Sequence, residues 1–197
     1  MDAAAIPTLP ADSTLMDGVV LYANAIDSPM KNALMEIENF AGVVQATTNT
    51  NTTGAYAFNN IPSGIYKMNI TPYDDWGGGN ATDALMILNH FSHLDTLEGM
   101  KKAAADVNAS STINGTDAMY VMRRYSALID SFPAGDYLYH TDSLFVNQQH
   151  ITNNIRMICL GDVNASYEPT GAKSSSVDLI YEGVTNISSG VEFDLPV

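Results

Sequence analysis

Oxygen-bearing side chains recur at alternate positions of the segment DVNASSTINGTD, which spans residues 106–117. A calcium loop of about twelve residues uses such a pattern, because calcium is a hard cation that takes roughly six to eight oxygen ligands. In this register the ligands are Asp106, Asn108, Ser110, the Thr112 carbonyl, Asn114 through a water, and Asp117. The spacing therefore predicts a Ca²⁺ site at the start of a helix. The alternative is an ordinary helix that is capped by Asn114 or Thr116.

The helix that follows this loop has an earlier counterpart in the chain. Residues 80–94 and 114–128 align at an offset of 34 and share the start Asn-x-Thr-Asp-Ala. This internal repeat predicts two similar helices, and residues 96–106 predict a shorter connecting helix. Three apolar residues at i, i+3 and i+6 predict the face by which each helix packs against the other. They are Leu85, Leu88 and Phe91 in one copy, and Met119, Met122 and Tyr125 in the other.

The pentapeptide DVNAS of the calcium loop occurs again at residues 162–166, with no helix after it. The earlier helix, in contrast, lacks the first half of a calcium loop, because residues 72–79 before it do not contain the ligand pattern. We therefore hypothesise that a second calcium site is split along the chain, with Asp162, Asn164, Ser166, the Glu168 carbonyl, Asn80 behind a water, and Asp83 as its ligands. Two alternatives stay open. Residues 162–166 form a polar turn, or Asp74 or Asp75 supplies the missing ligand.

Short alternating runs separated by turn residues extend from about residue 18 to residue 70. Alternation of apolar and polar side chains is typical of antiparallel strands with one buried face. Five such runs predict a small β-sandwich, and they cover residues 17–23, 32–39, 42–50, 54–61 and 64–70.

Two stretches resemble known families. The segment DVNASSTINGTDAMYVMRRY resembles one half of a type I dockerin, and the segment TGAYAFNNIPSGIYKMNI resembles carboxypeptidase regulatory-like and collagen-binding B-type repeat domains. The dockerin resemblance implies two loop-helix segments related by a pseudo-twofold axis, bound Ca²⁺, neighbouring termini and a cohesin partner. It also departs from the family, because Ser110 replaces the usual aspartate and Ser111 the usual glycine. We therefore expect weaker calcium affinity, with Ser111 in a left-handed conformation at a cost of roughly 1 kcal/mol.

The same resemblance implies which residues face the partner. Carried over to this sequence, they are Gly115, Thr116, Met122 and Arg123 in one copy, and Ala81, Thr82, Leu88 and Asn89 in the other. The two sets differ, so we expect one face to be preferred. Gly115 and Ala81 also replace a serine that is frequent in the family, which puts the choice of cohesin in doubt.

Charge and composition restrict the partners. Eight basic and 22 acidic residues give a net charge of -14, which repels phosphate backbones and anionic membranes but attracts divalent cations. No apolar stretch approaches the ~20 residues of a membrane-spanning helix, so we expect neither nucleic acid nor a membrane span. The single cysteine, Cys159, lies in an apolar segment and is predicted to be buried. His90 and His93 are expected to be surface or packing residues rather than metal ligands.

Together these features predict an α+β, mainly β fold in four segments: an N-terminal extension (1–15), a small antiparallel β-sandwich (16–72), a dockerin-like helical unit with a strand insertion (73–168), and a linker or strands of an incomplete β-module (169–197). No catalytic motif is recognised. The predicted function is noncatalytic protein docking outside the cell or at its surface, with a cohesin-like domain or a neighbouring copy as partner.

The alternative function is a structural subunit of a cell-surface fibre or adhesin. The strands predicted after Val177 would then complete a neighbour's sheet by strand addition. The ending VEFDLPV resembles the opening strands of cohesin-like β-domains. The sequence leaves open whether residues 141–161 belong to the sandwich or to the helical unit.

Overall fold

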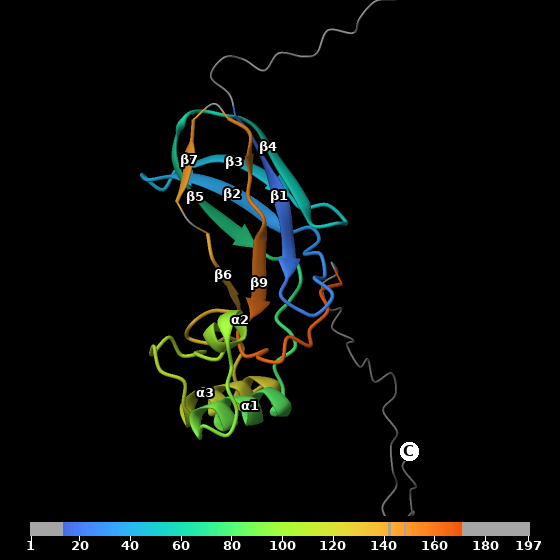
Figure 1. Cartoon of the computed structure of the whole chain (residues 1–197), viewed down its shortest axis with the longest axis vertical. Helices are drawn as coiled ribbons and strands as arrows, with labels where there is room; N and C mark the ends of the chain where they lie inside the picture. Colours follow the sequence, from blue (N-terminus) through green and yellow to red (C-terminus); the bar gives the residue numbers. More distant parts are fainter. Residues whose placement is uncertain (1–13, 142, 148, 171–197) are drawn as a thin grey trace, which may run out of the picture.

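Two β-sheets form one end of the molecule, and three helices form the other (Figure 1). The computed structural model describes residues 14–170 apart from residues 142 and 148. Residues 1–13 of the predicted N-terminal extension (1–15) and the strands expected after Val177 lie outside the described residues. Within the described residues the α+β, mainly β fold is confirmed.

The first sheet is built around the longest strand. Its order is β4-β1-β9-β6, and β8 also pairs with β1. The bounds are β1 (Thr14–Tyr22), β4 (Ala55–Ile61), β6 (Tyr137–Tyr139), β8 (Ile151–Thr152) and β9 (Ile155–Cys159). Strand β1 alternates regularly between buried and half-buried residues, and Met16, Val20 and Tyr22 on its inner face are fully buried. Strand β9 runs parallel to β1, with Val20 opposite Ile155.

The second sheet has the order β3-β2-β5-β7. Its strands are β2 (Leu34–Asn39), β3 (Val44–Asn49), β5 (Gly64–Thr71) and β7 (Leu144–Val146). Tyr66, Met68 and Ile70 alternate into the core that the two sheets share. The prediction of five strands before residue 72 is therefore confirmed. Strands β7, β8 and β9 pair with β5 and β1, so residues 144–159 add strands to the sandwich. The domain boundaries at 72/73 and 168/169 stay a prediction.

The helical unit begins with two similar helices and a short connector. The helices are α1 (Ala81–Phe91), α2 (Gly99–Ala103) and α3 (Gly115–Tyr125). Both α1 and α3 start with the same reciprocal cap. The Asn80 and Asn114 side chains accept bonds from the first turn, and the carboxylates of Asp83 and Asp117 accept the cap N–H. The capping box satisfies two otherwise unpaired donors at each helix start, which explains the shared Asn-x-Thr-Asp motif.

The predicted packing face of these helices is wrong. Helices α1 and α3 contact each other through small and branched side chains, Ala84 and Ile87 with Ala118 and Val121, which are buried in the second core. The residues of the predicted face are exposed instead; they are Leu85, Leu88, Phe91, Met119, Met122 and Tyr125. An α-helix turns by about 100° per residue, so Leu85, Leu88, Met119 and Met122, each one position after a buried residue, point away from the contact. Among the described residues, no element covers this apolar stripe.

Trp76 joins the two ends of the molecule. Its ring packs against both the sandwich core and the helical core, and its indole N–H donates to the Leu160 carbonyl over 2.7 Å. The Arg124 guanidinium stacks on this ring at 4.3 Å from its centroid and forms an ion pair with Asp136. The helical unit is therefore seated on the sandwich by an aromatic contact with satisfied polar groups.

Candidate calcium-binding loops

Residues 106–117, called loop A here, fold into a tight turn around the Asp106 carboxylate. The Ser110 N–H donates to Asp106 Oδ1 over 2.9 Å, and the Ser111 N–H donates to Asp106 Oδ2 over 2.7 Å. Asn108 Oδ1 also accepts from the Ser110 N–H, at 2.9 Å. Ala109 and Ser111 adopt left-handed φ values of 56° and 64°. The left-handed conformation that was expected at Ser111 is thus present, at a position where glycine is favoured.

The second DVNAS segment folds in the same way. The Ser166 N–H donates to Asp162 Oδ1 over 3.0 Å and to Asn164 Oδ1 over 2.8 Å, and the Tyr167 N–H donates to Asp162 Oδ2 over 3.1 Å. Ala165 has a φ of 57°, like its counterpart in loop A. Five identical residues therefore form similar turns in two places.

The second half of each loop ends at an aspartate in the first turn of a helix. In loop A, Asp117 Oδ2 accepts the Asn114 N–H over 3.0 Å, while its Oδ1 is buried and has no hydrogen-bond partner. In the other copy, Asp83 Oδ2 accepts the Asn80 N–H over 3.0 Å, and its Oδ1 accepts the Asn164 N–H over 3.0 Å. The fold thus brings residues 80–83 against residues 162–167, and the two halves together are called loop B here.

Each loop holds two carboxylates close together. Burial raises the pKa of Asp83, and the nearby Asp162 carboxylate raises it further. Burial likewise raises the pKa of Asp117, with Asp106 as the neighbouring charge. Two like charges in a desolvated place are unfavourable unless a cation is bound between them. The electrostatics of both loops therefore favour a cation.

The donor set fits calcium better than a transition metal. Among the residues that the structure describes, no group of three or more His, Cys, Asp and Glu side chains converges. Each loop instead combines two carboxylates with amide, hydroxyl and carbonyl oxygens. Such neutral and charged oxygens are ligands for calcium. Asp117 Oδ1 is buried in loop A without a hydrogen bond of normal geometry, although the Asn108 backbone N–H lowers the pKa of this carboxyl. His90 Nδ1 instead accepts the Leu97 N–H over 3.1 Å.

The glycine run before α1 supplies a feature that the sequence analysis missed. Gly78 has a φ of 88°, and a Cβ on it would lie 2.6 Å from Asp162 Oδ2. Only glycine allows the backbone to pass this close to the carboxylate. Gly78 lies 34 residues before Thr112, which is the offset of the repeat. In loop B, Gly78 therefore corresponds to Thr112, whose backbone carbonyl is a predicted ligand of loop A. The prediction from the sequence assigned this carbonyl of loop B to Glu168. The repeat offset was the signal for this residue, and Gly78 is a second candidate for the carbonyl ligand.

Asp74 and Asp75 are engaged elsewhere. Asp74 Oδ1 accepts the Thr170 N–H over 3.1 Å and the Thr170 hydroxyl over 3.2 Å. The Asp75 carbonyl accepts hydroxyl bonds from Tyr137 and Tyr167. These contacts join residues 74–75 to the segments beside loop B. Asp74 or Asp75 as a ligand of the split loop stays an alternative.

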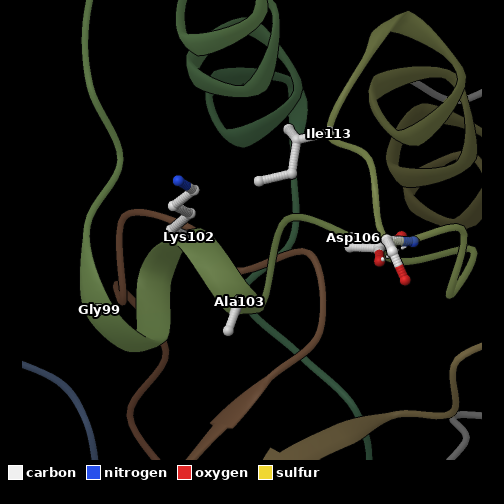
Figure 2. Close-up of a pocket in the computed structure, with 6 residues that line it drawn as sticks. Gly99, Lys102, Ala103, Asp106 and Ile113 are labelled. Atoms are coloured by element: carbon white, nitrogen blue, oxygen red, sulfur yellow. Dashed lines mark hydrogen bonds between the residues drawn. The ribbon is translucent and has the colours of Figure 1, made fainter.

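The two loops differ in their surroundings. Loop A borders an open pocket of about 370 Å³ whose lining includes Gly99, Lys102, Ala103 and Ile113. In Figure 2, Lys102 and Asp106 lie at opposite ends of this pocket, with Ile113 between them. Asp162 in loop B is fully buried, and the Tyr22 hydroxyl donates to its Oδ2 over 2.5 Å. Nothing in the sequence indicates this contact, since Tyr22 lies 140 residues from Asp162.

The residues that the dockerin resemblance places at the partner interface all belong to α1 and α3. All are exposed except Asn89, which is half-buried. They adjoin the exposed stripe of Leu85, Phe91, Met119 and Tyr125. The predicted partner-facing residues are thus accessible, and they lie next to apolar side chains that no described element covers.

Comparison with known proteins finds a family match in the helical segment. The sequence model of the dockerin type I domain matches residues 79–125, so the predicted dockerin resemblance is confirmed for this part of the chain. The match begins just before α1 and ends with α3, which leaves out the DVNAS half of loop B. No curated protein matches the chain.

Solved structures match a smaller part of the chain. The major pilin subunit BcpA of Bacillus cereus matches at 23% identity with a TM-score of 0.28, over 30% of this chain and 19% of the pilin. The TIE protein of Bacillus anthracis matches at 20% identity with a TM-score of 0.29, over 31% of this chain and 12% of that protein. This chain therefore spans less than a fifth of either protein. The resemblance of the sandwich to carboxypeptidase regulatory-like domains stays a prediction.

No helix within the described residues has the length and apolar character that a membrane crossing needs.

Proposed function

We propose that this chain is a noncatalytic, extracellular docking module that binds two calcium ions, one in loop A and one in loop B. The observation that carries the proposal is the shared geometry of the two DVNAS segments. Each wraps its amide N–H groups around an aspartate and faces a second aspartate at a capped helix start. In loop A the second aspartate has a buried oxygen without a partner.

Calcium would neutralise the paired carboxylates and link each loop to the helix that follows it. Asp106 and Asp117 would hold the ion in loop A, together with Asn108, Ser110, Asn114 and the Thr112 carbonyl. Asp162 and Asp83 would hold the ion in loop B, together with Asn164, Ser166, Asn80 and a carbonyl from Glu168 or Gly78. An ion that binds the folded state alone stabilises it by mass action, so α1 and α3 would be preorganised for a partner.

The docking surface would be the exposed side of α1 and α3. A contiguous set of exposed apolar side chains on a helical pair is typical of a protein interface. We propose a cohesin-like domain as the occupant, because the dockerin type I match covers both helices. The copies differ where Arg123 in α3 replaces Asn89 in α1. An arginine can make an ion pair with an acidic partner that asparagine cannot make, so the α3 side should be preferred by such a partner.

A calorimetric calcium titration of chelator-treated protein tests the metal sites. The full chain should bind two ions, Asp117→Asn should lose the site in loop A, and Asp162→Asn should lose the site in loop B. The exposed Asp130→Asn is the matched control and should keep both sites. Unchanged stoichiometry in Asp162→Asn would refute the split site, and a wild-type chain without any calcium binding would refute the proposal as a whole.

A pull-down with purified cohesin domains tests the partner. Calcium-dependent capture that is lost in Leu88→Asp with Met122→Asp would support the docking surface. Mass measurement by light scattering over a range of concentrations tests the alternative. Self-assembly without cohesin capture would contradict the docking function and favour the fibre subunit.

A further inference from the structure

We propose that Tyr22, a core residue of the β-sandwich, is a positioning residue for the calcium ligand Asp162, so that the sandwich itself completes loop B. The inference rests on the proposed function, because it requires calcium to bind in loop B. It adds a residue from β1, which lies outside both the dockerin match at residues 79–125 and the loop segments themselves.

The hydrogen bonds around Tyr22 define its direction. The Cys159 N–H donates to the Tyr22 oxygen over 3.0 Å, and the Tyr22 hydroxyl donates to Asp162 Oδ2 over 2.5 Å. A tyrosine hydroxyl has a single proton, and the Cys159 N–H occupies an acceptor position of the oxygen. The proton is therefore directed to Asp162. Tyr22 has 0% exposure, and its ring packs edge-on against Tyr167, so the phenol is held in place on several sides.

The comparison with loop A shows what Tyr22 adds. Both carboxylate oxygens of Asp106 accept backbone N–H bonds from Ser110 and Ser111. Asp162 accepts the equivalent bonds from Ser166 and Tyr167. Asp162 differs from Asp106 in the 2.5 Å bond from Tyr22 and in a longer bond of 3.4 Å from the Ser166 hydroxyl to its Oδ1. Asp106 lies beside an open pocket, whereas Asp162 has 0% exposure.

This difference has a consequence for calcium affinity. A hydrogen bond from outside the ligand set fixes the orientation of a ligating carboxylate, and loss of such a partner lowers metal affinity by about 10-fold to 100-fold. Tyr22 also connects Asp162 to the Cys159 backbone at the end of β9. An ion in loop B would therefore stabilise β1 and β9 of the sandwich, while an ion in loop A would have no comparable connection.

The test compares Tyr22→Phe in two single-site backgrounds of the full chain, titrated with CaCl₂. Loop B is measured in Asp117→Asn, where we expect Tyr22→Phe to raise the Kd about tenfold or more. Loop A is measured in Asp162→Asn, where the Kd should change less than about twofold, since a site that loses no contact behaves independently. Tyr56→Phe is the matched control, because Tyr56 is a buried tyrosine of the same sheet whose hydroxyl donates to the Asn153 carbonyl over 2.7 Å. It should leave both sites unchanged.

The outcomes separate this inference from the proposed function. If loop B binds calcium in Asp117→Asn but Tyr22→Phe leaves its Kd unchanged, or weakens loop A equally, Tyr22 has no positioning role. If Asp117→Asn binds no calcium, the split site fails and the inference fails with it.

A second measurement needs no change at Tyr22 and covers the case in which Tyr22→Phe does not fold. Amide hydrogen exchange at Cys159 is followed by NMR in Asp117→Asn, with and without calcium at about ten times the Kd. If the opening that exposes the Cys159 amide also releases the ion, calcium at about ten times the Kd should slow the exchange by a factor of 1 + [Ca²⁺]/Kd, which is about eleven. Equal exchange rates would overturn the coupling between loop B and β9.

Discussion

Replacement of the first aspartate in each loop by asparagine should have unequal effects on stability, although the two pentapeptides are identical. Asp162 accepts four bonds, from the Tyr22 hydroxyl, the Ser166 N–H, the Ser166 hydroxyl and the Tyr167 N–H, and it has 0% exposure. An asparagine in its place must direct an NH₂ group at one of these donors whichever way the amide is oriented. Asp106 accepts two bonds, is half-exposed, and its donors can turn to water.

The expected magnitudes follow from these contacts. Hydrogen bonds to charged groups contribute roughly 1.5–3 kcal/mol each, and a buried unpaired donor costs about 1–3 kcal/mol. We therefore expect Asp162→Asn to lower the free energy of unfolding by about 3 kcal/mol in EDTA, and Asp106→Asn by about 1 kcal/mol. For a chain of this size, each kcal/mol lowers the Tm by roughly 2–4 °C.

Thermal unfolding followed by circular dichroism at pH 7 in EDTA measures both effects without calcium. The Tm of Asp162→Asn should fall about three times as far as that of Asp106→Asn. Asp130→Asn, at an exposed position, should leave the Tm unchanged. Equal losses for Asp162→Asn and Asp106→Asn would refute the role assigned to burial and to the Tyr22 bond.

Three further predictions concern acidity, the thiol and the docking surface. Burial raises the pKa of Asp83 and Asp117, so in EDTA these carboxyls bind protons more tightly in the folded state than in the unfolded chain. The free energy of unfolding should therefore rise as pH falls from 7 through the folded pKa. Asp117→Asn should reduce this dependence of the free energy of unfolding on pH, as measured by thermal unfolding. With calcium the slope should reverse, because protons compete for the ligands. Burial raises the pKa of Cys159 to about 12, so a disulfide reagent at pH 8 should react with the thiol only after unfolding in urea, and rapid reaction of the native chain would contradict its buried position. Leu88→Asp and Met122→Asp, both at exposed positions, should change the Tm by less than about 2 °C but abolish calcium-dependent cohesin capture; unaltered capture would place the interface elsewhere.

The local pattern of the sequence predicted much of the fold. Alternation located β1 to β5 because each strand has one buried face, and the Asn-x-Thr-Asp motif located the starts of α1 and α3 because capping is a local interaction. The turn around Asp106 also followed from spacing, since its hydrogen bonds join residues at most five apart. These features depend on neighbours in the chain, which the sequence shows directly.

The features that the sequence did not predict depend on distant contacts. The packing face of α1 and α3 was assigned to their large apolar residues, but Ala84 and Ala118 allow the closer contact, and volume alone does not reveal which stripe is buried. Tyr22 was only part of the predicted strand 17–23, because nothing in the sequence of β1 indicates that Asp162 lies beside its hydroxyl. The role of Gly78 depends on the same approach of distant segments.

The parallel pairing of β1 with β9 has a mechanical consequence. A pull that enters at Thr14 and leaves at Thr170 would act on the start of β1 and on the segment beyond the end of β9. Because Val20, Leu21 and Tyr22 pair in the same direction with Ile155, Arg156 and Met157, the tension would shear these strands lengthwise, so that their bonds resist together instead of opening one at a time. Loop B follows β9 directly, so the chain would transmit the load through the turn around Asp162 before it reached the sheet.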